Sequence, residues 1–420
     1  MSSRALVLAA LVPFLTGAAP TPADLAIVAA EGHVNAAPAR PAAYVELATA
    51  FMQKSREASD PGYYPRAAAA LDRALAIDPG NYEALRVRPW VLLGQHDFRA
   101  ARAAAEQARA LEPDDWWNFG MVADAAVELG DYAAAERAVQ RMLDLRPGLP
   151  AYTRAAFLRT LYGDRAGAIE MLNLALATTS PADPETWAWT LVHLGHEHFA
   201  RGEAERAGDA YVRALDALPE YYLALVGLAR VRAADGHLSE AVELYRRAVV
   251  RLPAPDVVAA LGDALAAEGQ VDDAERQYAL VEYIGRVARA TGTTYGRQIA
   301  LFYADHDRRP DEALRLAEQE AAVRDDIYTD DTLAWACYKN GRLARAKRAA
   351  SRAQRLGTED ALLDYHAGVI AAALGRPGAG RRHLRHALAL NPHFDLHEVP
   401  RATALLAELD TPSGLARVVP

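Results

Sequence analysis

The sequence predicts an all-α fold, namely a right-handed solenoid of about ten antiparallel helix pairs followed by a C-terminal capping helix. Prolines recur at a step of 34 residues, at Pro79, Pro113 and Pro147. Each interval holds two segments in which apolar residues repeat with the period of a helix, joined by a short turn. No long linker follows residue 41. A fixed period of this length is typical of stacked helical hairpins.

A small residue opens the second helix of each predicted pair. A small side chain at a helix crossing lets two helices approach closely, while large side chains such as Tyr211 and Tyr278 fill the space beside it. Gly195 and Gly262 are expected at small positions of this kind on first helices. The ladder, with steps of 33, 34 or 39 residues, is Ala67, Ala101, Ala135, Ala168, Ala207, Ala241, Ala274, Ala313, Ala346 and Gly380.

Two units carry a family resemblance most clearly. They are "WWNFGMVADAAVELGDYAAAERAVQRMLDLRP" (116–147) and "YLALVGLARVRAADGHLSEAVELYRRAVVRLP" (222–253), in which a glycine makes the turn between the helices and a proline closes the unit. The chain resembles tetratricopeptide-repeat proteins, and in full it is similar to exported bacterial members whose role is not established. This resemblance implies a concave surface lined by the first helix of each unit, and it implies no activity.

The chain opens with the layout of a signal peptide. One cation, Arg4, precedes an apolar run that reaches small residues near Ala19. This run is shorter than the roughly 20 residues needed to span a bilayer. We therefore expect an extracytoplasmic protein, periplasmic or secreted, without stable membrane insertion after cleavage. The expected organisation is a signal peptide over 1–19, a flexible segment over 20–40, the repeats over 41–394, a capping helix over 395–410 and a tail over 411–420.

Composition excludes several classes of function. The single cysteine, Cys337, rules out an intramolecular disulfide. The net charge of −9 argues against nucleic acid as a partner, because a phosphate-binding protein needs a basic face. Residues 341–386 depart from this average, with ten Lys and Arg against three acids. A solvated helix face explains this stretch most simply, and an anionic partner in the cell envelope is the alternative.

Neither catalysis nor a cofactor is expected. The sequence has no Gly-rich phosphate loop and no GxSxG elbow. The stretch "HLGHEHFARGEAERA" (193–207) is rich in histidine, but zinc proteases need two histidines four apart with glutamate after the first. Here Glu197 is followed at once by His198, so we expect no metal site. A metal- or small-ligand-binding protein that uses this cluster, or the second one of His366, His383, His386, His393 and His397, remains the alternative function.

Exposed positions of the first helices are the candidates for binding. Aromatic side chains at such positions are anchors worth roughly 2 kcal/mol or more when a partner buries them. The leading interpretation is a non-catalytic scaffold that binds a protein or an extended peptide in the concave groove. The alternative for any one residue is packing between neighbouring repeats. The candidates are Arg86, Trp90, Trp117, Phe157, Trp189, His193, His196, Arg230, Tyr328, Asp331, Trp335, Tyr338 and Tyr365, with Asp124 and Asp263 as further groove positions.

Overall fold

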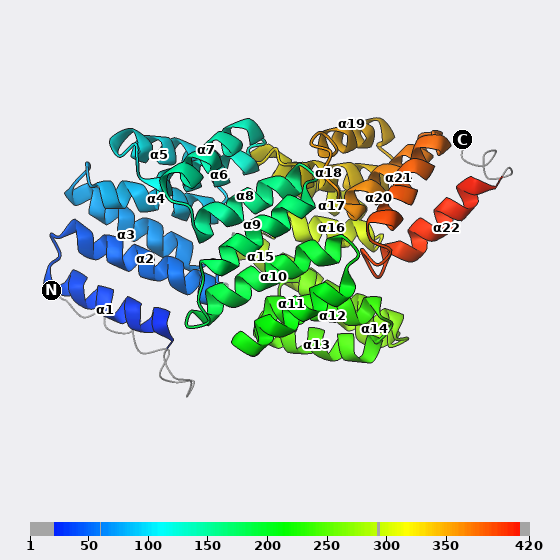
Figure 1. Ribbon diagram of the computed structural model, residues 1–420, viewed down its shortest axis with the longest axis horizontal. Helices are drawn as coiled ribbons and strands as arrows, with labels where there is room; N and C mark the ends of the chain where they lie inside the picture. Colours follow the sequence, from blue (N-terminus) through cyan, green and yellow to red (C-terminus); the bar gives the residue numbers. More distant parts are fainter. Residues whose placement is uncertain (1–20, 59, 292–294, 412–420) are drawn as a thin grey trace. The chain divides into compact units, whose positions relative to one another are not determined.

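The fold is all-α, as the sequence predicts. The computed structural model describes residues 21–58, 60–291 and 295–411, and within these ranges it contains helices and no strand (Figure 1). The predicted signal peptide lies outside the described residues. In the described part of the chain no helix is both long enough and apolar enough to span a bilayer.

In the described residues, eighteen helices form nine antiparallel pairs, and α22 (Glu398–Asp410) follows the last pair. Polar caps begin many of the helices, for example Asp97, Asp131 and Asp164, each of which accepts a hydrogen bond from a backbone N–H of the first turn. The pairs are α2 (Pro41–Ala58) with α3 (Tyr63–Ile77), α4 (Tyr82–Gly94) with α5 (Phe98–Leu111), α8 (Leu149–Leu161) with α9 (Arg165–Ala177), α10 (Pro184–Ala200) with α11 (Ala204–Ala217), α12 (Tyr222–Ala234) with α13 (Leu238–Arg251), α14 (Pro255–Ala267) with α15 (Val271–Thr291), α16 (Gly296–Asp305) with α17 (Pro310–Val323), α18 (Ile327–Lys339) with α19 (Leu343–Ala353), and α20 (Ala361–Ala373) with α21 (Pro377–Leu390). Between the second and third of these pairs in sequence the chain forms α6 (Trp116–Glu128) and α7 (Tyr132–Leu145).

An additional helix, α1 (Pro22–Ala36), precedes the first pair. The expectation of a flexible segment over 20–40 is therefore wrong. Thr21 and Asp24 form a capping box that satisfies two backbone N–H groups at the helix start. Asp24 also forms an ion pair of 2.8 Å with Lys54 of α2. The capping box and the ion pair with α2 thus hold residues 21–36 in a defined structure.

Small and large residues meet at the helix crossings, as the ladder predicts. Ala101, Ala135 and Ala207 are fully buried. Gly195 of α10 and Gly227 of α12 face the ring of Tyr211, and a Cβ atom at either glycine would lie within about 2.5 Å of a ring carbon. These positions need glycine because the tyrosine ring occupies the space of a side chain.

The chain forms two compact units, one up to Ala126 and one from Val127 onward, with α6 crossing the boundary. The sequence suggests a single continuous array instead. In a simple solenoid each repeat contacts only its neighbours. The second unit departs from this pattern, because segments about 190 residues apart in its sequence lie in contact.

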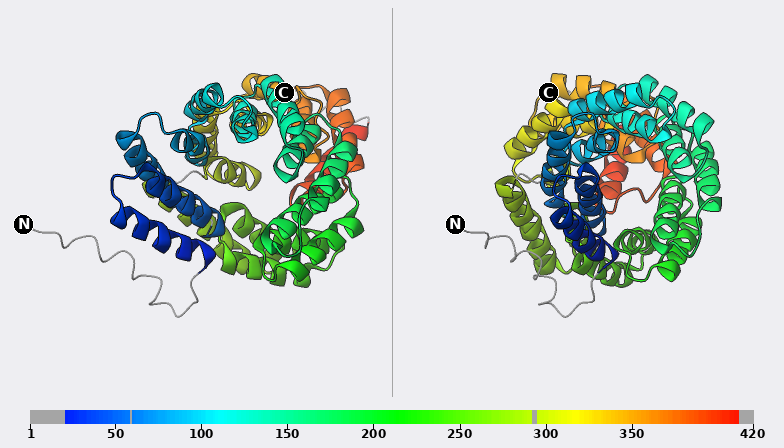
Figure 2. Two further views of the ribbon diagram at one scale, coloured as in Figure 1. Left: turned by 60° about the vertical axis from the view of Figure 1, so that its left-hand side comes forward. Right: turned by 90° about the vertical axis from the view of Figure 1, so that its left-hand side faces the viewer.

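These long-range contacts join loops that precede first helices to turns of earlier repeats. Figure 2 shows the helices of the second unit following one another around a curve. Backbone and side-chain hydrogen bonds hold the contacts between distant repeats. Examples are Asp325 N to Glu128 O (2.9 Å), Arg165 Nε to Glu359 O (2.6 Å) and Asn391 Nδ2 to Phe199 O (2.8 Å).

Candidate binding site

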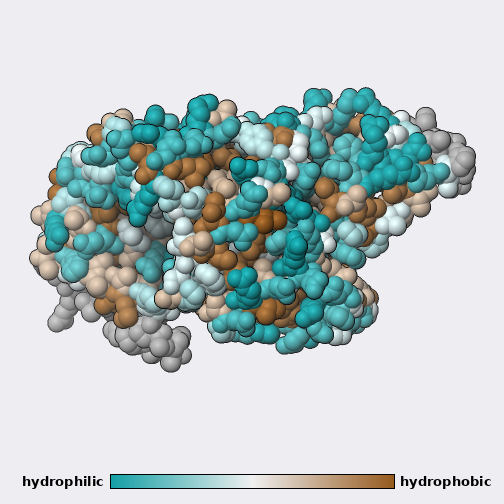
Figure 3. Space-filling view, viewed as in Figure 1, coloured by the Kyte–Doolittle hydropathy of each residue, from teal (hydrophilic) through white to brown (hydrophobic). Residues whose placement is uncertain are grey.

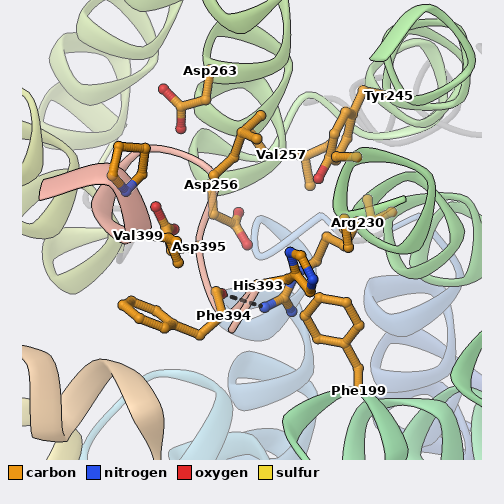
Figure 4. Close-up of a pocket in the computed structure, with 16 residues that line it drawn as sticks. Phe199, Arg230, Tyr245, Asp256, Val257, Asp263, His393, Phe394, Asp395 and Val399 are labelled. Carbon is orange, nitrogen blue, oxygen red and sulfur yellow. Dashed lines mark hydrogen bonds between the residues drawn. The ribbon is translucent and has the colours of Figure 1, made fainter. Parts of the chain in front are cut away.

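A pocket of about 400 Å³ lies on the first-helix side of the second unit (Figure 4). Helices α10, α12 and α14 form one side of it, and residues 393–400 form the other. Its apolar lining includes Val226, Val257, Phe394 and Leu396. The pocket exists because the segment before α22 returns to the inner face of three earlier repeats.

Three carboxylates line the pocket among these apolar groups. Asp256 and Asp263 are seven residues apart on α14 and therefore share a helix face. Asp395 lies on the opposite side, where its Oδ1 accepts hydrogen bonds of 2.8 Å from the backbone N–H groups of His397 and Glu398. Figure 4 shows these acidic side chains converging from α14 and from the returning segment. The arrangement favours a cationic group in the pocket.

Burial perturbs two of these carboxyl groups. Desolvation by the neighbouring residues raises the pKa of Asp256, although this residue remains exposed at the pocket wall. Burial also raises the pKa of Asp395, and the negative charge of Asp263 adds to the effect. Desolvation disfavours the charged form of a carboxyl, so a cation that enters the pocket stabilises the ionised state. Protons therefore compete with a cationic ligand for this site.

Arg230 and His393 form a different part of the wall. The Arg230 guanidinium lies 4.7 Å from the ring centroid of Phe199, and its Nη2 donates to the Phe394 carbonyl at 3.4 Å. This cation–π contact and the weak hydrogen bond orient an otherwise exposed side chain. The pocket thus presents one guanidinium and three carboxylates around an apolar floor.

The sequence named Arg230 and Asp263 as groove positions, and the structure places both on the pocket wall. It did not single out Asp256 or Asp395, and it noted His393 only as part of a histidine group. Asp256 and Asp263 share a helix face, and this spacing was readable from the sequence. No local pattern indicates that residues 393–400 complete the site.

Three predicted groove residues are buried, so their assignment to an open face is wrong. Trp335 is 1% exposed and stacks between the rings of Tyr338 (5.0 Å) and His366 (4.2 Å). The Oδ2 atom of Asp331 lies within hydrogen-bond distance, 2.8 Å, of His366 Nδ1. Tyr365 donates a hydrogen bond to Glu398 at the start of α22. These side chains form a polar and aromatic core between the last repeats and the capping helix.

This core is also electrostatically unusual. The Trp335 Nε1–H donates to Asp305 Oδ1 at 2.7 Å. Burial raises the pKa of Asp305 to about 7. Burial likewise raises the pKa of Tyr328, another predicted groove residue, which is half-buried. Asp305 is therefore held by a partner within the protein.

Trp189, His193 and His196 form a half-buried aromatic row on α10. The Trp189 and His193 rings lie 4.0 Å apart, and His196 Nδ1 lies 2.8 Å from the Tyr211 hydroxyl. Burial lowers the pKa of His193 to about 4 and that of His196 to about 3, so both are neutral near pH 7. Neither belongs to a cluster of three metal-ligating side chains in the described residues. Phe157, by contrast, is 46% exposed on α8.

The candidates of the first unit pack on one another. Trp90 and Trp117 meet edge to face at 5.7 Å. Arg86 lies over Trp117 and forms an ion pair of 2.5 Å with Asp115. The Trp117 Nε1–H donates to the Arg86 carbonyl. These contacts match the alternative in which such residues pack between neighbouring repeats.

The basic stretch over 341–386 is partly neutralised. Figure 3 shows hydrophilic side chains gathered over α19 and α21, which carry most of it. Five of its ten cations form ion pairs with acids of other helices, which leaves a weaker positive face than the sequence suggests. The pairs are Arg345 with Glu318, Arg352 and Arg355 with Asp330, and Arg381 and Arg385 with Asp410.

Comparisons with known proteins agree with the repeat architecture. A sequence profile for the tetratricopeptide repeat matches residues 90–150 and 193–256. A search among curated proteins gives no match. Similar solved structures include PilW, a type IV pilus biogenesis factor (20% identity, 49% of this chain and 93% of that one, TM-score 0.42), and a human IFIT1 dimer with PPP-AAAA (15% identity, 91% and 89%, TM-score 0.49). A third is MamA (19% identity, 38% and 91%, TM-score 0.32).

Proposed function

This chain is a tetratricopeptide-repeat protein, and we propose that it is a non-catalytic scaffold that acts outside the cytoplasm and binds an extended segment of a partner protein. Repeats of this kind form binding surfaces on the inner side of the solenoid. The pocket between α14 and residues 393–400 is the part of that surface that receives a side chain. We assign a lysine or arginine side chain of the partner to it.

The pocket carries this proposal. Three carboxylates line it beside apolar side chains, Asp256 and Asp263 from α14 and Asp395 from the returning segment. Lysine and arginine combine a charged end with an aliphatic stem that packs on apolar surface. The charged end meets the carboxylates while Val257 and Leu396 contact the stem. Arg230 on the neighbouring wall repels a second cation, so the pocket admits one basic side chain in a defined position.

A peptide titration tests this assignment. We expect nine-residue peptides with a central arginine, selected from a random library on the full chain, to lose at least about tenfold in affinity when citrulline replaces the arginine, because citrulline keeps the shape without the charge. Asp256→Asn should cause a similar loss. Affinity should also fall as the pH drops from 7 toward 4, and the fall should begin above the ordinary aspartate pKa of 3.8, because burial raises the pKa values of Asp256 and Asp395 and lets protons displace the cation. Fluorescence anisotropy measures all three effects.

Asp272→Asn is the matched control. Asp272 is an exposed acid in the first turn of α15 and does not line the pocket. This variant removes the same charge and should leave peptide affinity unchanged. Equal binding of the arginine and citrulline peptides would contradict the proposal. Binding of free arginine as tight as that of the peptide would instead identify a receptor for small basic molecules.

Export rests on the sequence, through Arg4 and the short apolar run behind it. We expect N-terminal sequencing of the protein from native cells to find a new terminus between about residues 18 and 24. The same material should partition with the extracytoplasmic fraction. Cytoplasmic protein that retains Met1 would refute the proposed location.

A further inference from the structure

A second cluster adjoins the pocket, shares Asp263 with it and adds two histidines. Asp263, His306 and His397 come from α14, from the end of α16 and from the residue before α22, and one candidate ligand atom of each lies within 4.8 Å of the others. From this cluster we propose that the chain binds a divalent transition metal ion of the zinc class. The inference goes beyond peptide binding and does not depend on it.

Each histidine has one ring nitrogen fixed by a backbone carbonyl. His306 Nδ1 lies 2.9 Å from the Phe302 carbonyl, and His397 Nε2 lies 3.1 Å from the Asp305 carbonyl. A carbonyl only accepts hydrogen bonds, so both contacted nitrogens carry the proton. In the neutral imidazole the other nitrogen then presents a lone pair. Metal-binding histidines are oriented in this way by an outer hydrogen bond.

Hydrogen bonds also position the Asp263 carboxylate. Asp263 Oδ1 accepts a hydrogen bond of 2.8 Å from the Tyr278 hydroxyl and lies 2.7 Å from His306 Nε2. Without an ion, this second contact is a hydrogen bond from the imidazole to the carboxylate. A bound metal ion would replace the shared proton and take the Nε2 lone pair and the carboxylate oxygen as ligands. Two histidines and one carboxylate form the ligand set of many zinc sites that keep one open position.

An ion would require small adjustments of this cluster. A tetrahedral ion about 2.0 to 2.1 Å from its nitrogen and oxygen ligands needs ligand atoms roughly 3.3 Å apart. Asp263 Oδ1 and His306 Nε2 must separate from 2.7 Å to reach this spacing, and the stacked ring of His397, whose centroid lies 4.7 Å from that of His306, must supply the third ligand atom. Asp263 also lines the pocket, which gives an ion and a fourth, water ligand access from solvent.

Zinc titration of the full chain, prepared without a histidine tag and stripped with a chelator, tests the site. We expect one equivalent of Zn²⁺ to bind with micromolar or tighter affinity, and Co²⁺ to give the visible absorption of a tetrahedral site. His306→Gln and His397→Gln should each weaken binding at least about a hundredfold. Tyr278→Phe keeps the ring and removes only the hydrogen bond to Asp263, so it should cost about tenfold.

Control variants separate this site from adventitious binding. His383 and His386 flank Asp364 at 2.7 Å each on a partly exposed face. The double change His383→Gln/His386→Gln should leave the single equivalent and the cobalt spectrum intact. Loss of zinc binding in this variant, or its retention in both His306→Gln and His397→Gln, overturns the proposal. Circular dichroism checks folding, and Asp263→Asn replaces any ligand variant that fails to fold.

Discussion

Replacing Trp335 by alanine is expected to destabilise the second unit by about 3 to 5 kcal/mol, in the range of large-to-small changes at buried aromatic sites. The indole is 1% exposed, stacks between Tyr338 and His366, and donates to Asp305. Its removal leaves a cavity and a buried carboxyl without its N–H donor. Denaturant unfolding followed by circular dichroism measures the loss, and hydrogen exchange locates it in α18 and α20.

Trp189→Ala provides the comparison. Trp189 is half-buried and contacts His193 at one face of α10, so its loss should cost clearly less stability. Peptide binding should be little affected by Trp335→Ala under conditions where the variant is folded, since Trp335 does not line the pocket. A stable Trp335→Ala variant that has lost its partner would restore the original assignment of this residue to the binding groove.

Local periodicity made the fold predictable. Tyr211 fits against Gly195 and Gly227, and Tyr278 fits against Gly262 in the same way, because these hairpins repeat one crossing of small and large residues. Such a pattern depends on residues in one repeat and its neighbour, which a fixed period of about 34 residues reveals. Helix α1 was missed although its capping box, Thr21 with Asp24, was readable in the sequence.

Register alone could not distinguish exposed positions from buried ones. Trp90 and Trp335 both lie eleven residues before the ladder alanine of their pair, Ala101 and Ala346. Trp90 nevertheless remains half-buried while Trp335 is fully enclosed. The difference comes from the neighbours that each helix meets in space, and the repeat pattern does not encode those neighbours.

The pocket and the proposed metal site were unpredictable for the same reason. Asp395 and His397 precede α22, whereas Asp263 lies more than 130 residues earlier on α14. Only the return of the chain across the second unit brings them together. The hydrogen bond from Asn391 to the Phe199 carbonyl and that from Arg230 to the Phe394 carbonyl hold this return in place. The pocket and the proposed metal site therefore depend on contacts that a linear solenoid lacks.

Arg165 makes another long-range contact of the second unit, with residues 357–360. Replacing it by methionine should destabilise the unit by about 3 to 5 kcal/mol. Its side chain is 6% exposed, pairs with Glu197 at 2.9 Å and donates to the Glu359 carbonyl at 2.6 Å. Methionine retains much of the volume but leaves the Glu197 carboxylate buried without its cation. Chemical denaturation measures the loss, and hydrogen exchange should show faster opening of residues 357–360.

Two further variants separate the buried charge from the general effect of losing an arginine. Arg159→Met removes an exposed pair with Asp164, for which we expect a change of about 1 kcal/mol or less. The double change Arg165→Met/Glu197→Gln should recover part of the stability lost by Arg165→Met, because no carboxylate then remains unpaired. If Arg165→Met lowered the free energy of unfolding no more than Arg159→Met does, the ion pair with Glu197 would be dispensable. Apolar packing would then hold residues 357–360 against α9.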